Sequence, residues 1–281
     1  MSVEMIQERL ASYGCKSALD EEQALREISQ EIILAGLGRT DFFNRAGFQG
    51  GTCLRVFHSL NRFSEDLDFA LRKPDATFKL VPYLEQVCDE LTAYGYKLEI
   101  DDRSKGGQTV KKAFLKDDSL GTLLRLNYRP RSGPMRKLRV KLEVDTNPPA
   151  GASYEMPVLD YPFPSAVRVF DLPSLFAGKI HALLCRNYLK GRDWYDFVWY
   201  TARHTPINHN LLSSALDQQG PWAGKHQATD NTWCKENLIT AIEAVDWTSA
   251  RKDVQRFLKP SELPSLELWT SKFFVAQCRK L

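Results

Sequence analysis

The chain has 281 residues, of which 43% are hydrophobic and 26% charged, and its formal net charge is +3. This composition is typical of a folded globular protein with a substantial core, and it excludes a disordered or fibrous chain. So small a net charge does not by itself identify a nucleic acid, a membrane or an acidic substrate as partner.

Cysteine usage and the N-terminus bear on the compartment. The six cysteines include no C-x-x-C pair, so a zinc site built on His204 and His209 would lack the cysteine pair that completes many such sites. The opening residues, MSVEMIQERL, are charged, and no apolar run approaches the roughly 20 residues that span a membrane. We therefore expect a cytoplasmic protein with reduced thiols and no membrane contact.

Apolar periodicity predicts a first part in which helices alternate with strands. The strand at 138–144 is the clearest, because its leucine and valine residues alternate with charged ones. The other segments follow the same two periods, with helical spacing at 20–37, 54–60 and 80–96 and strand alternation at 66–71, 108–116 and 121–129.

Beyond residue 165 the pattern becomes mostly helical, with candidates at 172–188 and 193–200. The proline- and glycine-rich stretch 147–164 separates the two parts and is typical of a connector. We therefore predict an α/β domain over residues 1–165 and a helical domain over 166–281.

The stretch GGTCLRVFHSLNRFSEDLDF, residues 50–69, opens on a glycine pair. Gly50 and Gly51 allow a ligand to approach the main chain closely. Thr52 stands at the predicted start of a helix, where free N–H groups and the helix dipole favour a phosphate. Taken alone, the pair is more typical of an ordinary strand-to-helix turn.

The same stretch closes on Asp66 and Asp68, which lie two residues apart on a predicted strand and so point to one face. Paired carboxylates suit a hard cation such as Mg²⁺, although a D-x-D pair on a solvated strand face is common. The interval from Gly51 to Asp66 leaves room for one short helix and a turn. The glycine turn and the two acids would then meet, as binding of a nucleoside triphosphate with its metal requires.

A third acid is expected from the strand at 138–144. Glu143 and Asp145 both fall on its polar face, and either could face the two aspartates across a neighbouring strand. Three acids can hold two metal ions about 3.5–4 Å apart. We favour Glu143 because it lies centrally in the alternation, and Asp145 stays open as the alternative.

At these residues the sequence resembles a known family. G-G-T-x-L, followed by R-x-S-x-D-x-D-F, resembles the signature of DNA polymerase β-type nucleotidyltransferases, and within them the AbiEii toxin branch that includes the MenT toxins. A second block, KIHALLCRNYLKGRDWYDF at 179–197, is similar to that branch's K-x-x-A-x-x-x-R followed by R/K-D-x-x-D. The resemblance covers about residues 20–200 and implies the α/β (α+β) polymerase β-like fold, a mixed sheet with helices, followed by a helical region that completes the active site.

The second block also has a physical interpretation. Lys179 and Arg186 lie seven residues apart, hence on one face of a predicted helix, where both could grip triphosphate oxygens. Asp193 and Asp196 begin the next predicted helix and would neutralise or orient that pair. By itself the block is more typical of a surface helix with an ion pair.

Together the two blocks define the expected site. The resemblance implies that Asp66, Lys179 and Asp196 are functional, and we expect them to be the catalytic residues. The expected metal ligands are Asp66, Asp68 and Glu143. The expected nucleotide-binding residues are Gly50, Gly51, Thr52, Arg62, Ser64, Lys179 and Arg186.

The resemblance implies transfer of a nucleotidyl group from an NTP to a hydroxyl, with Mg²⁺ or Mn²⁺ as cofactor and pyrophosphate as product. It further implies the 3′ end of tRNA as acceptor, a block of translation, and a separately encoded antitoxin. Basic residues within 103–112 and 125–141 could follow an RNA backbone or form solvated surface. Two alternatives are a nucleotidyltransferase that modifies a small molecule or a protein, and a non-catalytic binding protein of the same fold.

Overall fold

The computed structural model describes most of the chain. The described residues are 3–92, 98–104, 109–117 and 138–281. The predicted strand at 121–129 and most of the basic stretch 125–141 lie outside them.

The described chain forms two compact units. The first consists of Met1–Phe57, Glu65–Asn147 and Met156–Val169, and the second of His58–Ser64, Pro148–Glu155 and Phe170–Leu281. Each unit is built from several chain segments, because the chain passes from one to the other more than once. The single boundary at residue 165 stays a prediction.

The first unit is built on a mixed sheet with strand order β3-β4-β5-β2-β1-β9. Strand β2 runs parallel to β5 and antiparallel to β1, and β4 runs antiparallel to both of its neighbours. A separate pair, β7 and β8, is antiparallel. The bounds are β1 Ala46–Gln49, β2 Asp66–Leu71, β3 Leu98–Asp102, β4 Val110–Asp117, β5 Leu138–Asp145, β7 Val158–Leu159, β8 Ser165–Ala166 and β9 Val169–Phe170.

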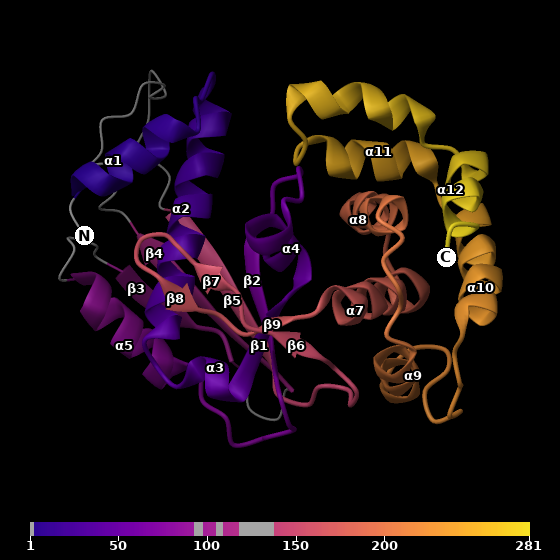
Figure 1. The fold of residues 1–281 in the computed structure, drawn as a ribbon, viewed down its shortest axis with the longest axis horizontal. Coiled ribbons are helices and arrows are strands. Elements are labelled where there is room, and N and C mark those ends of the chain that lie inside the picture. Colours follow the sequence, from indigo (N-terminus) through magenta and orange to yellow (C-terminus); the bar gives the residue numbers. More distant parts are fainter. Residues whose placement is uncertain (1–2, 93–97, 105–108, 118–137) are drawn as a thin grey trace. The chain divides into compact units, whose positions relative to one another are not determined.

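Helices of the first unit cover the sheet. Helix α2 packs on α5 and β5, and α5 also packs on β3 (Figure 1). Helix α2 begins where the Ser17 hydroxyl accepts a hydrogen bond from the Asp20 N–H, with acidic residues in its first turn. The bounds are α1 Val3–Ser12, α2 Ala18–Gly38, α3 Phe42–Arg45, α4 Gly50–His58 and α5 Val81–Thr92.

An aromatic cluster beneath β2 determines which way its acids point. Phe69 is 1% exposed and meets Phe42 edge-on at 5.0 Å and Phe48 at 5.2 Å, between ring centroids. Leu67, two residues earlier, is also fully buried. Because side chains alternate along a strand, burial of Leu67 and Phe69 directs Asp66 and Asp68 to the opposite face.

The second unit is helical, apart from β6 and the end of β9. Helix α7 packs on α8, α9 and α10, and α8 packs on α11 and α12 (Figure 1, orange to yellow). Its core is aromatic, with Trp247 stacked on Phe274 at 4.0 Å and Trp194 edge-on to both. The bounds are β6 Tyr154–Glu155, α7 Leu172–Cys185, α8 Gly191–Ala202, α9 His209–Gln218, α10 Asn231–Glu243, α11 Trp247–Gln255, the 3₁₀ helix η1 Pro260–Leu268 and α12 Ser271–Cys278.

Several elements differ from the sequence-based prediction. The helix predicted over 172–188 ends at Cys185, because Arg186 has extended backbone angles. The stretch 147–164 is more than a connector, since it contains β6 and β7 and divides between the two units. Helix α1 and strands β1 and β3 were not predicted.

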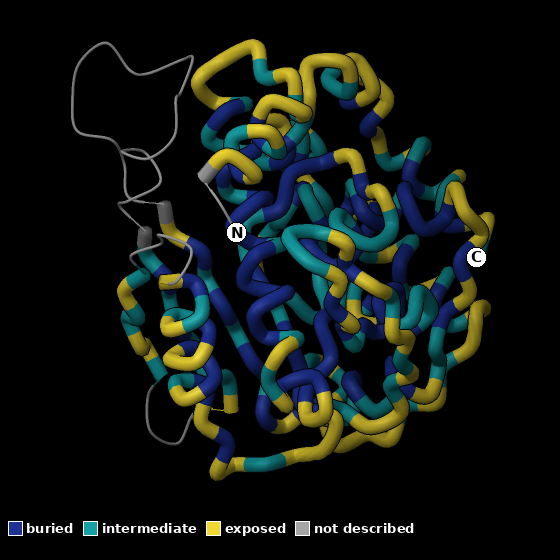
Figure 2. The backbone as a smooth tube through the Cα atoms, turned by 60° about the vertical axis from the view of Figure 1, so that its left-hand side comes forward, coloured by how far each residue is buried: buried dark blue, intermediate teal, exposed yellow. Residues whose placement is uncertain are grey.

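The degree of burial differs between the interior of the protein and its surface. Buried residues run through the inner elements, while exposed residues follow the outer helix faces and loops (Figure 2). Among the described residues, no helix combines the length and the apolar character needed to cross a membrane.

Candidate active site

Strands β2 and β5 bring three carboxylates to one face of the sheet. Asp68 of β2 is the register partner of Glu143 of β5, and Asp66 is the partner of Lys141. Register partners on parallel strands direct their side chains to the same side. We call Asp66, Asp68 and Glu143 the acidic face. The predicted adjacency of Glu143 to the two aspartates is therefore confirmed.

Two lysines neutralise the third acid of this face. Lys112 Nζ of β4 lies 2.8 Å from Glu143 Oε1, and Lys141 Nζ lies 2.6 Å from Glu143 Oε2. Burial raises the pKa of the Glu143 carboxyl, but the two lysines more than offset this and hold it below the usual value. The pKa of Lys141 is correspondingly raised: burial lowers it, but the bond to Glu143 and the charges of Asp66, Glu143 and Asp68 outweigh that effect.

The glycine turn lies directly against the acidic face. Helix α4 begins at Gly50 immediately after β1, whose last residue, Gln49, is the register partner of Asp68. Gly50 has φ +79°, and a Cβ placed there would lie 2.6 Å from Asp68 Oδ2. Only glycine therefore permits both this backbone conformation and this close approach. The first turn of a helix presents unpaired N–H groups, so phosphate-binding groups and carboxylates are neighbours here.

Thr52 has a structural contact in this arrangement. Its side chain is fully buried, and its hydroxyl donates a 2.5 Å hydrogen bond to the Asp66 carbonyl oxygen. That bond ties the first turn of α4 to the start of β2. The predicted phosphate contact of Thr52 can therefore use only its backbone N–H while this bond is present.

The acidic face fits a divalent cation through Asp66 and Asp68. Both offer carboxylate oxygens, the donors that hard cations prefer, from one face of one strand. Glu143 directs both of its oxygens at lysines. Accordingly, no group of three or more histidine, cysteine or carboxylate side chains among the described residues is arranged to hold a metal ion. The metal role of Glu143 stays a prediction.

Asp145, the alternative third acid, lies one step farther along β5. Its register partners are Ala70 and Val110, and its Oδ1 accepts a 2.9 Å hydrogen bond from the Asn147 N–H. Burial raises the pKa of its carboxyl. This environment is that of a carboxylate at a strand end that caps the following turn.

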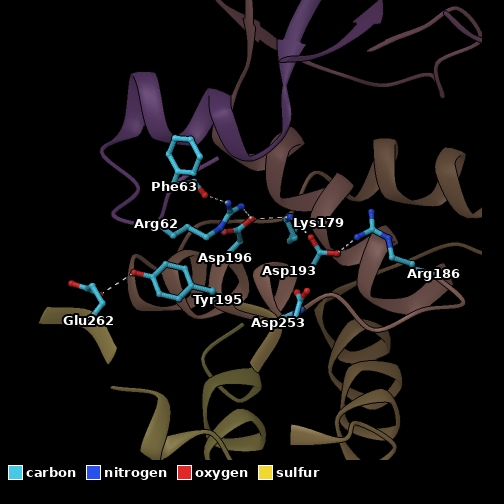
Figure 3. Close-up of polar contacts among 10 residues, drawn as sticks. Arg62, Phe63, Lys179, Arg186, Asp193, Tyr195, Asp196, Asp253 and Glu262 are labelled. Carbon is cyan, nitrogen blue, oxygen red and sulfur yellow. Dashed lines mark hydrogen bonds and ion pairs between the residues drawn. The ribbon is translucent and has the colours of Figure 1, made fainter. Parts of the chain in front are cut away.

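The second sequence block, residues 179–197, forms an ion-pair network inside the second unit. Lys179 of α7 lies between two carboxylates of α8, with its Nζ 2.6 Å from Asp193 Oδ1 and 2.8 Å from Asp196 Oδ2 (Figure 3). Arg186 also contacts Asp193. We call Arg62, Lys179, Arg186, Asp193 and Asp196 the buried ion-pair network.

The Arg62 side chain is buried within this network and is not exposed to solvent. Its Nε and Nη2 each lie 2.6 Å from an oxygen of Asp196, a bidentate pair, and its Nη1 donates to the Phe63 carbonyl at 3.0 Å (Figure 3). The two side chains are 3% and 0% exposed. The guanidinium thus fixes the Asp196 carboxylate that contacts Lys179. The nucleotide-binding roles of Arg62 and of Ser64, which is also buried, stay predictions.

The predicted common helix face of Lys179 and Arg186 is wrong, because α7 ends at Cys185. Both cations nevertheless meet at Asp193. Burial raises the pKa of the Asp193 carboxyl, but Lys179, Arg186 and Lys190 outweigh it and lower the pKa to about 2. Desolvation lowers the pKa of Lys179, and its two carboxylates raise it above the usual value. Asp193 and Lys179 are therefore both charged at neutral pH.

Sequence reasoning missed the two lysines of the acidic face. Lys141 precedes Glu143 by two residues on the polar face of one strand, so alternation alone could have paired them. Lys112 reaches Glu143 only because β4 pairs with β5 in the register that places them side by side. No local pattern in the sequence contains that second contact.

Comparison with known proteins decides the family. Residues 32–273 match the family model described as nucleotidyl transferase AbiEii toxin, type IV toxin–antitoxin system. The chain belongs to the AbiEii family. This AbiEii chain is accordingly a nucleotidyltransferase toxin of a toxin–antitoxin system, with a nucleotide substrate and an antitoxin partner. The alternative of a non-catalytic binding protein is set aside.

Solved structures share the fold of this AbiEii toxin. JHP933 from Helicobacter pylori aligns with a TM-score of 0.54 and 16% identity, over 92% of this chain and 91% of that one. MenT4, a nucleotidyltransferase toxin from Mycobacterium tuberculosis, aligns with a TM-score of 0.50 and 17% identity, over 95% and 97% of the two chains. The predicted mixed α/β fold is therefore confirmed. None of the curated proteins matches the sequence.

Proposed function

We propose that this AbiEii toxin transfers a nucleotide from an NTP to the 3′ end of tRNA in the cytoplasm, in a reaction that requires Mg²⁺ or Mn²⁺, and so blocks translation. One observation carries the proposal: Asp66 and Asp68 share one face of β2, and Asp68 lies directly against the glycine turn at the start of α4. A helix N-terminus beside paired carboxylates suits a triphosphate and its cation.

The chemistry is a nucleotidyl transfer. The acceptor hydroxyl loses its proton to solvent and its oxygen forms a bond to the α-phosphorus of the NTP. The bond from that phosphorus to the oxygen that bridges it to the β-phosphate breaks, and pyrophosphate leaves. We assign the cation to Asp66 and Asp68, where it would offset the charge that develops on the transferring phosphate. The N–H groups at Gly50 and Gly51 would donate hydrogen bonds to phosphate oxygens.

We assign the triphosphate also to Lys179, and a positioning role to the acids beside it. Asp193 and Asp196 hold the Lys179 ammonium from two sides, and Arg62 in turn holds Asp196. An ammonium group whose position is already fixed loses little conformational entropy when it binds a phosphate. On this proposal residues 166–281 form the helical domain that completes the active site.

The RNA acceptor is the least supported part of the proposal. In the segment 103–112, Arg103 donates to Asp101 and Lys112 pairs with Glu143, so these two cations are neutralised within the protein. This pairing favours the second candidate, a nucleotidyltransferase that modifies a small molecule or a protein and needs no basic surface. The AbiEii family membership favours the RNA acceptor.

A labelling experiment separates the two candidates. The purified toxin is incubated with each α-labelled NTP, total RNA and a total protein extract, with and without EDTA. We expect label in tRNA that depends on the divalent cation. Sequencing of tRNA 3′ ends after brief expression of the toxin then identifies both the tRNA that is modified and the nucleotide that is added. Label in protein or in the small-molecule fraction, with none in tRNA, would contradict the RNA proposal.

A further inference from the structure

Two lysine side chains lie against the acidic face. Three carboxylates, Asp66, Asp68 and Glu143, share it with the ammonium groups of Lys141 and Lys112. Like-charged carboxylates at neighbouring strand positions repel one another, so the two lysines stabilise the arrangement.

The ammonium group of Lys141 lies between acids of two neighbouring strands. Its Nζ lies 2.6 Å from Glu143 Oε2 and 3.8 Å from Asp66 Oδ2, and it thus bridges β5 and β2. Asp68 contributes to its electrostatic environment as well. Its side chain is 28% exposed, so solvent screens these contacts only in part. Lys112, by contrast, forms its ion pair within the described part of the chain with Glu143 and not with either aspartate.

We propose that Lys141 is a resident counter-ion of the acidic face that competes with a free divalent cation, so that the enzyme takes up its cation together with the triphosphate. The inference rests on the proposed function in treating Asp66 and Asp68 as cation ligands. A bare divalent cation bound by these acids meets the ammonium of Lys141 as a like charge. A cation that arrives on a triphosphate brings negative charge with it and removes that conflict.

Lys141 is on this account a positioning residue, which sets when the cation binds without touching the reacting atoms. The charge of its ammonium, and not the packing of its aliphatic stem, carries the effect. A variant that removes the charge should therefore change the Mn²⁺ affinity, and a variant that retains the charge should not. Lys116, on β4, is a matched control, because its Nζ pairs with Asp101 at 2.7 Å and not with the acidic face.

The test measures binding of Mn²⁺ to the full chain, by the electron paramagnetic resonance signal of free Mn²⁺, without nucleotide. We expect Lys141→Met to bind Mn²⁺ at least about tenfold more tightly than the wild type, because the like charge is gone. Lys141→Arg and Lys116→Met should bind as the wild type does. In the presence of a non-hydrolysable NTP analogue, the difference between Lys141→Met and the wild type should shrink to about threefold or less.

The double variant Asp66→Asn/Lys141→Met identifies the site, because the gain in affinity should disappear in it. An unchanged Mn²⁺ affinity in folded Lys141→Met overturns the inference, and Lys141→Gln gives the same measurement should the methionine variant unfold. Wild-type protein that labels tRNA while Lys141→Met binds Mn²⁺ no more tightly refutes this inference alone. Tightened binding in Lys141→Met, with no tRNA label from the wild type, refutes the tRNA proposal alone.

Discussion

Asp68 lies directly beside Glu143 on the neighbouring parallel strand, and the two carboxylates share the face that carries Asp66. Lys112 and Lys141 each contact one oxygen of Glu143, so this third acid is neutralised, and Lys141 also lies 3.8 Å from Asp66 Oδ2. The arrangement separates the three acids into different roles. The predictions below test those roles and the buried ion-pair network.

Asp66→Asn should abolish nucleotide transfer while the protein stays folded. The amide keeps the shape of the carboxylate but removes the charge that a divalent cation requires. We expect kcat to fall at least about a thousandfold, measured as transfer from α-labelled NTP. The melting temperature should not fall, because the change relieves repulsion from Asp68. Wild-type activity in this variant would refute the assignment of Asp66.

Glu143→Gln and Asp145→Asn together identify the third acid. Glu143 faces Asp68 across the strand pair, whereas Asp145 faces Ala70 and caps the turn at Asn147. We expect transfer to fall at least about tenfold in Glu143→Gln and to change less than about threefold in Asp145→Asn. The opposite order of effects would move the third acid to Asp145.

Gly50→Ala should impair activity through Asp68. The φ of +79° disfavours any residue with a Cβ, and that Cβ would lie 2.6 Å from Asp68 Oδ2, so the carboxylate must shift. We expect a loss of at least about tenfold in kcat/KM for NTP.

Gly178→Ala in helix α7 is the matched control, because a Cβ there meets nothing within 4 Å. Its activity should stay at the wild-type level, and it should gain up to about 1 kcal/mol of stability from helix propensity. Equal losses in the two variants would show that Gly50 has no special relation to Asp68.

Arg62→Met should destabilise the protein strongly. It removes the bidentate partner of Asp196, whose side chain is 0% exposed. Breaking a buried pair from one side typically costs about 3–5 kcal/mol, to be measured by urea unfolding. The double variant Arg62→Met/Asp196→Asn should recover part of that loss. Arg103→Ala, at an exposed pair with Asp101, is the control and should leave stability unchanged.

Asp193 makes stability depend on acid pH. Its pKa in the folded protein is about 2, below the ordinary 3.8, because Lys179, Arg186 and Lys190 outweigh its burial. The unfolded chain therefore takes up the proton first as pH falls. The stabilisation is complete above about pH 4 and is lost by about pH 2, a contribution on the order of 2 kcal/mol.

The measurement is the free energy of unfolding across this range. In Asp193→Asn, whose side chain does not titrate, the slope between about pH 4 and about pH 2 should be smaller than in the wild type. An identical slope in both proteins would show that other carboxyl groups govern the acid sensitivity.

Much of the site could be predicted from short patterns. The alternation at Leu67 and Phe69 predicted that Asp66 and Asp68 face one way, and the spacing from Gly51 to Asp66 predicted one helix between turn and strand. Both are local properties, since a few residues fix a period. The end of α7 could not be predicted in the same way, because apolar residues continue past Cys185 while the backbone does not stay helical.

The sequence by itself identified the functional groups of the candidate site, namely a glycine turn, paired carboxylates and a lysine followed by two acids. It also identified the fold class. Only the tertiary structure decided that β5 is the neighbour of β2, that Lys112 contacts Glu143, and that Arg62 contacts Asp196. Arg62 and Asp196 are 134 positions apart in the chain. Strand pairing and buried ion pairs depend on contacts over such separations, and no local period in the sequence encodes them.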